Sequence, residues 1–305
     1  MPRFRPVLLV LLGMLLFGCR REPTAEGQAA SHLAALRQAG FLGGKRGSTQ
    51  VLDVRLVAPQ ATGFSAAGEP LWWATLQTDD GEAGFLAWQV GGGHELVDFA
   101  LEGLAELSTE QGVALPGVPP IQQFAVRGKD GQAVASGCVP TAAASLVAYW
   151  SNRGTYDWQA DDSHEGLTLR LRDRLPMQAI PDLAGFTDGK MALAGTSAHA
   201  LVAGLKEDAA QYKVPVAVTL EPFAFAALRQ EIVAGRPALL TCGVPVPRKP
   251  ELSWGHAVVA VGFAEIDGRP FVAVVDNYLV VRSPGTLRWI AADRCRELVF
   301  VRPAR

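Results

Sequence analysis

The sequence predicts an α+β protein in which a helical segment precedes an antiparallel sheet, with a small β-rich module in front of both. Two observations favour this class. Helix-like apolar segments cluster between residues 137 and 235, and short runs rich in β-branched residues follow them up to residue 301. Such an order of helices and then strands is typical of α+β domains. The net charge of −2 gives no electrostatic reason to expect a nucleic-acid partner.

Residues 1–19 have the pattern of an export signal. Arg3 and Arg5 form a short positive region, and the apolar run 7–17 is too short to span a bilayer comfortably. The run ends in Leu16-Phe17-Gly18-Cys19, which resembles the bacterial lipoprotein box and implies that Cys19 is lipidated. An ordinary signal peptide with an incidental cysteine is the alternative. We expect a protein of the cell envelope, held on the membrane by its lipid and facing outside the cytoplasm, on the outer membrane or the periplasmic side.

Residues 20–115 are predicted to form a tether and then the β-rich module. Residues 20–30 are polar, and a short helix is expected over 31–39. Short apolar or alternating runs separated by Asp-Gly and Gly-rich turns follow between residues 50 and 103 and predict antiparallel strands. The Pro-rich stretch 115–120 should be extended. We place the boundary there, so that the module covers 31–115 and a second domain covers 117–305.

The second domain is predicted to contain helices and then strands. The helices are expected over 137–152, from Thr196 or Ser197 to about Lys213, and from Glu221-Pro222 to Gly235. The strands are expected over 238–242, 256–263, 271–276 and 297–301. Asp267-Gly268 lies between the second and third of these strands and predicts a tight hairpin.

Cys138 is the strongest candidate for a nucleophile. It directly precedes the apolar stretch 142–150, and Pro140 suits the start of a helix, where a missing N–H costs nothing. Unpaired backbone N–H groups and the helix dipole favour a thiolate at such an N-terminus. Because a thiolate is a nucleophile, this position predicts covalent catalysis.

A nucleophilic cysteine needs a base, and the base needs an orienting partner. Among the five histidines, His256 is the best candidate, because a polar ring at the start of an apolar strand needs a partner. The predicted hairpin brings Asp276, at the end of the next strand, within reach of His256. Gln132, six residues before Cys138, is a candidate for binding an oxyanion together with the Cys138 backbone N–H.

These segments together resemble papain-like cysteine peptidases, and C39-like peptidases in particular. The resemblance is carried by Gln132, Gly137-Cys138-Val139-Pro140, the strand 255–263 and Val274-Val275-Asp276-Asn277, and it covers roughly residues 117–302. The lead-in Pro119-Pro120-Ile121-Gln122-Gln123-Phe124 is also similar. One departure is Val139, where C39 relatives commonly have glycine.

The resemblance implies a papain-like fold and hydrolysis of a peptide or protein substrate without cofactor or metal. It assigns Cys138 as the nucleophile, His256 as the base, Asp276 as the orienting residue and Gln132 to the oxyanion hole. Papain carries Asn in the orienting position, so Asn277 remains an alternative to Asp276. The N-terminal module weakly resembles pro-regions of secreted cysteine peptidases. Its position leads to the hypothesis that it covers the cleft and keeps the enzyme latent.

Three alternatives stay open. A transglutaminase-like acyl transferase uses the same order of cysteine, histidine and aspartate, and a papain-like scaffold can also be an inactive binding module of the envelope. Cys242 and Cys295 either form a disulfide, which is allowed outside the cytoplasm, or are small buried apolar residues. The absence of a closely spaced cysteine pair argues against a structural zinc site.

Overall fold

A computed structural model describes the residues that form the sheet, the helices and the candidate site. The described residues are 24–41, 49–58, 69–78, 81–91, 93–101, 108–109, 112–128, 131–154, 156–160, 162–180, 192–246, 249–277 and 287–304. The predicted export signal and Cys19 lie outside them. No helix within these ranges is both long and apolar enough to cross a membrane.

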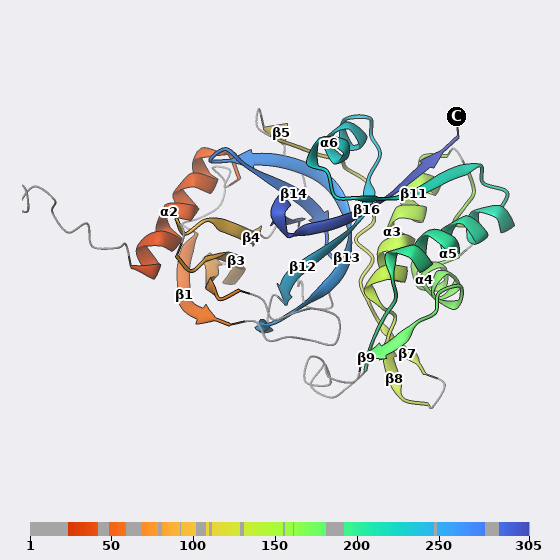
Figure 1. Ribbon diagram of the computed structural model, residues 1–305, viewed down its shortest axis with the longest axis horizontal. Coiled ribbons are helices and arrows are strands. Elements are labelled where there is room, and N and C mark those ends of the chain that lie inside the picture. The colour runs from red at the N-terminus through yellow and green to blue at the C-terminus, as the bar shows by residue number, and fades with distance from the viewer. Residues whose placement is uncertain are drawn as a thin grey trace, which may run out of the picture.

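One large antiparallel sheet joins the two ends of the chain (Figure 1). Its strand order is β1-β2-β3-β4-β15-β14-β13-β12-β16-β11. The strands are β1 (Gln50–Val57), β2 (Leu71–Thr78), β3 (Gly81–Gln89), β4 (Leu96–Leu101), β11 (Val216–Pro222), β12 (Ala238–Val246), β13 (Lys249–Ile266), β14 (Arg269–Val275), β15 (Leu287–Ala291) and β16 (Cys295–Pro303). Smaller strands are β5 (Ser108–Thr109), β6 (Gly112–Ala114), β7 (Ala125–Arg127), β8 (Ala133–Ala135), β9 (Gln178–Ile180) and β10 (Leu193–Gly195).

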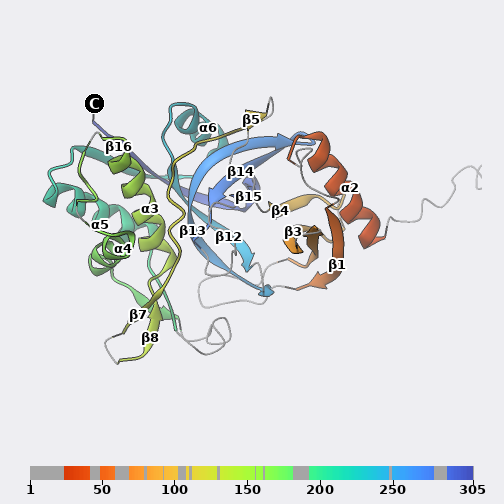
Figure 2. The same ribbon diagram turned by 180° about the vertical axis from the view of Figure 1, so that it is seen from behind.

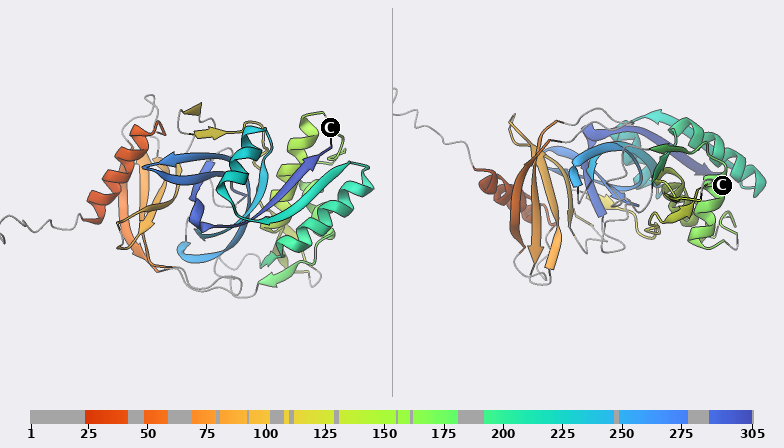
Figure 3. Two further views of the ribbon diagram at one scale, coloured as in Figure 1. Left: turned by 45° about the horizontal axis from the view of Figure 1, so that its top comes forward. Right: turned by 90° about the horizontal axis from the view of Figure 1, so that it is seen from below.

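The N-terminal strands continue the sheet of the C-terminal half. β4 pairs with β15, with Trp289 opposite Phe99 and Ile290 opposite Asp98, and β6 pairs with β13. The strands before and after the domain boundary expected near residues 115–117 therefore belong to one sheet. Figure 3 shows β1–β4 at one end of this curved sheet and α3–α5 at the other end.

The hairpin between β13 and β14 forms at the predicted position. Ile266 pairs with Arg269, and the two residues between them both have positive φ, 50° at Asp267 and 74° at Gly268. Positive φ at both central residues matches the two-residue turn whose twist suits antiparallel strands. This hairpin sets β14 beside β13, and so it determines where the residues that directly follow β14 lie relative to β13.

The first described helix corrects the predicted tether. α2 covers Ala25–Gln38, so residues 25–30 are helical and not a tether. The helix begins at Ala25 because the Thr24 side chain caps it, accepting a hydrogen bond from the Gly27 N–H at 3.2 Å. Ala29 is fully buried, and the Trp88 Nε1–H donates to Gln28 Oε1 at 2.8 Å. These contacts dock α2 onto the N-terminal strands.

The central helix α3 (Cys138–Asn152) confirms the predicted helix over 137–152. All of its residues from Val139 to Trp150 are buried, because β12 and β13 pack on one side and α4 (His164–Asp173) and α5 (Ala198–Gln211) on the other. Figure 2 shows α3 between the sheet and these two helices. A helix that is apolar all round is expected in such a position.

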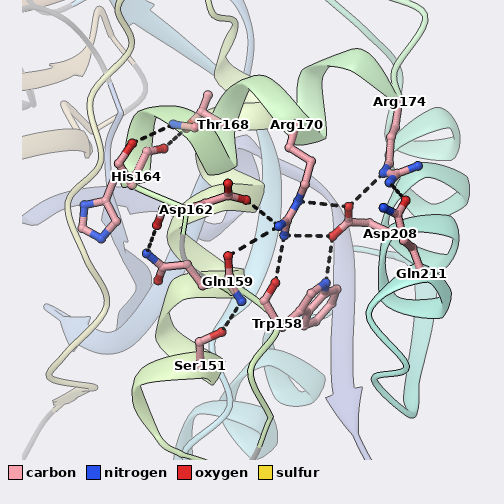
Figure 4. Close-up of polar contacts among 12 residues, drawn as sticks. Ser151, Trp158, Gln159, Asp162, His164, Thr168, Arg170, Arg174, Asp208 and Gln211 are labelled. Carbon is pink, nitrogen blue, oxygen red and sulfur yellow. Dashed lines mark hydrogen bonds and ion pairs between the residues drawn. The ribbon is translucent and has the colours of Figure 1, made fainter.

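A buried network joins α4 to α5 (Figure 4). Asp208, which is fully buried, accepts hydrogen bonds from Trp158 Nε1 at 2.9 Å, Arg174 Nε at 2.8 Å and Arg170 Nη2 at 3.3 Å. Helix α4 is absent from the sequence-based prediction. His164 begins α4, with Ser163 as its cap, and its ring points away from the network (Figure 4).

The last α-helix, α6, lies on the face of the sheet opposite to the one that α3–α5 cover. α6 (Phe225–Val233) begins later than predicted, because Glu221 and Pro222 complete strand β11 and do not open the helix. Leu228 and Ile232 of α6 pack into a second apolar cluster formed by β12, β13, β14, β15 and β16. A 3₁₀ turn, η2 (Ala292–Arg294), leads from β15 to β16. α3–α5 and α6 therefore cover opposite faces of the C-terminal strands.

Candidate active site

Cys138 is the first residue of α3, and a glycine turn places it there. Gly137 has φ of 95°, and a Cβ atom at this position would lie 2.7 Å from Met177 Cε and 3.1 Å from the Ala194 carbonyl oxygen. Both the positive φ and the lack of space require glycine. This turn leads the chain from β8 into α3, so that the thiol lies at the helix N-terminus as predicted.

The turn before Cys138 is held by side chains on both sides. Thr141 Oγ1 donates to the Gly137 carbonyl oxygen at 2.7 Å and lies 3.1 Å from Ser136 Oγ. Arg172, from α4, donates to the Ser136 carbonyl oxygen at 2.7 Å. Because these groups are buried or partly buried, their hydrogen bonds fix the backbone from which Cys138 projects.

The structure brings Cys138, His256 and Asp276 together. His256, on β13, is 2% exposed, and Asp276, directly after β14, is 4% exposed. His256 Nε2 lies 2.8 Å from Asp276 Oδ1, and the imidazole also hydrogen-bonds to the thiol of Cys138. The three side chains thus have the connectivity of a nucleophile, its base and the residue that orients the base.

Burial and mutual charge shift the pKa values of all three groups. Burial raises the pKa of the Cys138 thiol, but the hydrogen bond to His256 and its charge outweigh this and lower it below its usual value. Burial lowers the pKa of His256, yet the charge and hydrogen bond of Asp276 raise it to about 9. Burial also raises the pKa of Asp276, while His256 and then Arg288 lower it to about 2. These shifts favour a thiolate beside an imidazolium.

Two further buried residues lie behind Asp276. Arg288, on β15, donates from Nη1 to Asp276 Oδ2 at 2.9 Å. Its Nε donates to Asp98 Oδ1 on β4, also at 2.9 Å, and its Nη2 donates to Asp98 Oδ2 and to the Pro245 carbonyl oxygen. Neither residue is among the candidates from the sequence. Arg288 lies outside the strands expected in the C-terminal half, and Asp98 lies in the module that was expected to be separate. No local pattern in the sequence relates either residue to Cys138.

Asn277 holds backbone rather than the imidazole. Its Nδ2 donates to the carbonyl oxygens of Cys138 and Ala257, each at 2.9 Å. Its Oδ1 accepts from Gln123 Nε2, also at 2.9 Å. Since Asp276 is the residue bonded to His256, the geometry favours Asp276 over Asn277 as the orienting residue.

The structure does not bring Gln132 to Cys138. Gln132 is exposed directly before β8, and the extended residues of this strand, at about 3.3 Å each, lie between it and Cys138. A cavity beside Cys138 is lined instead by Gln123. Gln123 is 9% exposed and lies before the β7–β8 hairpin. The lining therefore favours Gln123 over Gln132 for this role, because the β7–β8 hairpin lies between Gln123 and Cys138 and lengthens the chain between them.

A comparison with protein families agrees with this arrangement. The model of the Peptidase C39-like family matches residues 116–284, which is more than half of the 305 residues. The chain belongs to the C39-like peptidase family. Its α+β fold is papain-like, as predicted. A comparison with curated proteins finds no match. The family match contains Cys138, His256 and Asp276, whereas Asp98 and Arg288 lie outside it.

A cavity of about 270 Å³ opens beside the thiol of this C39-like peptidase. Its lining comes from Gln123, the start of α3, the β10–α5 connection and strands β12, β13 and β16. These residues are Gln123, Cys138, Val139, Leu193, Ala194, Gly195, Thr196, Ser197, Ala198, His199, Thr241, Cys242, Gly255, His256, Ala257, Arg296 and Glu297. The described part of residues 31–115 contributes none of these residues, so the observed lining does not support the hypothesis that the N-terminal strands cover the cleft.

Two further cysteines and one further histidine of the C39-like chain lie on or near the elements that line the cavity. Cys242 and Cys295 are register partners on β12 and β16, and both thiols are free. Burial raises the pKa of each well above its usual value. His199 is exposed in the first turn of α5 and lines the cavity. Within the described residues, no cluster of three or more acidic, cysteine or histidine side chains has the arrangement of a metal site.

Proposed function

We propose that this protein is a cysteine peptidase that hydrolyses peptide or amide bonds through an acyl-enzyme. The observation that carries the proposal is the hydrogen-bonded row of Cys138, His256 and Asp276 beside a cavity at the N-terminus of α3. The lowered pKa of the thiol and the raised pKa of the imidazole, about 9, support an ion pair at neutral pH. Such a pair is the activated form of a cysteine nucleophile.

In the first half of the reaction, the Cys138 thiolate attacks the carbonyl carbon of the substrate. The carbonyl oxygen becomes an oxyanion, which the Cys138 backbone N–H and the Gln123 side-chain amide stabilise. Gln123 is suited to this role because Asn277 already holds one of its N–H groups. The His256 imidazolium then gives its proton to the leaving nitrogen, the C–N bond breaks, and a thioester remains on Cys138.

In the second half, water replaces the amine. The neutral imidazole of His256 takes a proton from a water molecule, and the hydroxide attacks the thioester carbonyl. Collapse of the second oxyanion releases the carboxylic acid product and restores the thiolate and imidazolium. Asp276 stabilises the imidazolium in both halves through its bond to Nε2.

A peptide library tests this proposal on many candidate substrates at once. Purified protein beginning at Arg20 is incubated with peptides prepared from a whole proteome, and new termini are identified by mass spectrometry. We expect cleavage that Cys138→Ala abolishes and that Cys295→Ala, at a free thiol that does not line the cavity, leaves in place. Cadaverine in the same reaction reports acyl transfer. Absence of new termini, or equal cleavage by the Cys138→Ala variant, contradicts the proposal.

We also propose that Cys19 is lipidated and holds the peptidase at the cell envelope. The support is the sequence alone: a short apolar run that ends in Leu16-Phe17-Gly18-Cys19. Labelling of cells with an alkyne-bearing fatty acid tests it. We expect the full-length protein to be labelled and to sediment with membranes, and the Cys19→Ser variant to be unlabelled. An unlabelled full-length protein contradicts the anchor and leaves the peptidase proposal unaffected.

A further inference from the structure

The row of side chains that begins at Cys138 continues across the sheet beyond Asp276. We infer that Arg288 and Asp98 form a positioning pair, in which Arg288 holds Asp276 toward His256 and Asp98 neutralises the charge of Arg288. The inference rests on the proposed function for its effect on turnover. Its effect on His256 itself does not depend on any substrate, so the two can fail separately.

The geometry places the four residues on, or directly after, four adjacent strands. His256 is on β13, Asp276 directly follows β14, Arg288 is on β15 and Asp98 is on β4, in the order of these strands in the sheet. Side chains on one face of a sheet meet across neighbouring strands. Arg288 and Asp98 are diagonal neighbours, because Asp98 pairs with Ile290. The row is therefore a direct consequence of the pairing of β4 with β15.

The hydrogen bonds of Arg288 leave Asp276 one orientation. Arg288 Nη1 occupies Oδ2 of Asp276 at 2.9 Å, and His256 Nε2 occupies Oδ1 at 2.8 Å. The guanidinium is fixed in turn, because its other nitrogens donate to both Asp98 oxygens and to the Pro245 carbonyl oxygen. A planar guanidinium with four of its five N–H groups in hydrogen bonds cannot rotate without breaking charged hydrogen bonds. Arg288 thus holds Asp276 on the side of the carboxylate that does not contact His256.

The charges in the row alternate in sign. The thiolate, the imidazolium, the Asp276 carboxylate, the guanidinium and the Asp98 carboxylate follow one another, and Arg288 and Asp98 are each no more than 2% exposed. A buried cation beside Asp276 would by itself oppose the imidazolium of His256. Burial raises the pKa of Asp98 and Arg288 opposes that rise, but a carboxylate that accepts from one guanidinium through both oxygens is in its ionised form. Asp98 therefore cancels the cation that holds Asp276.

The pair also shows how the N-terminal strands serve the site. Asp98 and Arg288 both lie outside the family match of residues 116–284, and Asp98 belongs to the module that was expected to be separate. A buried ion pair by itself is weak evidence of stabilisation, since apolar replacements are often equally stable. Contact with Asp276 gives this pair a more specific role than stability.

Other charged groups near His256 must stay constant in a test. These are Cys138 on α3, Cys242 on β12, Asp276 after β14, and Arg296 and Glu297 on β16, which line the same cavity. The variant Asp98→Asn changes none of them. It keeps the shape of the side chain and one oxygen that can accept from Arg288, and it replaces the other oxygen by a neutral NH2 group, so that the negative charge and one of the two acceptors are lost.

The first experiment compares the titration of His256 in the wild type and in Asp98→Asn by ¹⁵N NMR of the imidazole. Loss of the anion leaves Arg288 as an uncancelled cation, which disfavours the imidazolium. We expect the pKa of His256 to fall by on the order of one pH unit, and Asp98→Glu to restore it in part. An unchanged pKa in a folded Asp98→Asn protein overturns the inference.

Asp208→Asn is the matched control. Asp208 is also buried and also accepts from arginines, Arg170 and Arg174, but this network joins α4 to α5 (Figure 4). The same substitution there carries a similar cost in stability, and we expect no shift in the His256 titration. A shift equal to that of Asp98→Asn would show a general effect of destabilisation and would overturn the inference.

A double variant separates positioning from charge. Arg288→Met with Asp98→Asn replaces the pair by a neutral one of similar size, so the fold does not have to bury an unpaired charge. Asp276 Oδ2 then loses its donor. On any peptide found in the library we expect kcat to fall about 10- to 100-fold, the range known for partners that orient metal ligands, with KM changed less than twofold. Wild-type kcat in the double variant overturns the inference, whereas an inactive wild type with a shifted His256 titration contradicts only the proposed function.

Discussion

Asn277 Nδ2 donates a hydrogen bond to the backbone carbonyl oxygen of Cys138 at 2.9 Å. Its neighbour Asp276 is bonded to His256. Two consecutive residues therefore hold different parts of the site: Asn277 holds the backbone at the start of α3, and Asp276 holds the imidazole. This division of roles leads to distinct outcomes when each residue is replaced.

For Asn277→Ala we expect mainly a loss of stability. The substitution leaves the carbonyl oxygens of Cys138 and Ala257 and the amide of Gln123 without their buried partner, which costs about 2–3 kcal/mol. Urea unfolding measures the loss. Since the imidazole keeps Asp276, the pKa of His256 should stay near 9. A strongly lowered His256 pKa in a folded Asn277→Ala protein would instead make Asn277 the orienting residue.

For Asp276→Asn we expect a loss of activity that exceeds any loss of stability. The neutral amide cannot stabilise the imidazolium and favours the wrong tautomer, which lowers turnover by about 10⁴-fold in serine peptidases with the corresponding substitution. Cleavage of library peptides by the wild type and the variant measures the effect. Activity within tenfold of the wild type would show that His256 is oriented without this carboxylate.

The pH dependence should follow the two shifted groups. Hydrolysis needs the thiolate and the imidazolium, so its rate should rise through the lowered pKa of Cys138 and fall as His256 loses its proton near pH 9. Iodoacetamide alkylation reports the lower limb alone, because the thiolate remains reactive above pH 9. At pH 6 to 7 we expect labelling of Cys138 only, since burial raises the pKa of Cys242 and Cys295. Labelling of Cys138 that begins only near the free-thiol pKa of about 8.5 would contradict the ion pair.

The two glutamines provide a matched pair for the oxyanion. Gln123→Ala should lower kcat by about 10²- to 10³-fold, as removal of one oxyanion donor does elsewhere, because Gln123 lines the cavity. Gln132→Ala, at an exposed position, should leave kcat within twofold. The two variants are compared on the same peptide at the same pH. The reverse order of effects would restore Gln132 to the site.

Local patterns in the sequence are sufficient for the elements that carry the site. Pro140 and the apolar run after Cys138 predict α3, and Asp267-Gly268 predicts the hairpin that sets Asp276 beside His256. Thr196 or Ser197 is predicted to begin the next helix, and Ser197 caps α5 in the structure. In each case the determinant is within a few residues of the element it directs. The Thr24 side chain is a comparable signal for α2, although the predicted helix begins later.

The errors arise where distance along the chain differs from distance in space. Gln132 is suggested by its spacing from Cys138, but the β7–β8 hairpin places Gln123 there instead. The turn between Gly128 and Gly131, whose backbones are hydrogen-bonded, is the available signal for that hairpin. Arg288 and Asp98 cannot be found in this way, because nothing in a short run of residues records which distant strand it will pair with.

Asp98 and Arg288 are 190 residues apart in the chain. During synthesis from the N-terminus, Asp98 is made well before Arg288, so the pair cannot form until the 190 residues that separate the two have been added. Contacts of such high sequence separation form late, because a long loop must close first. A nascent or unfolded chain thus contains the cysteine but has no fixed Asp276 behind its histidine. The row from Cys138 to Asp98 is therefore completed only after Arg288 has been made and β15 has paired with β4.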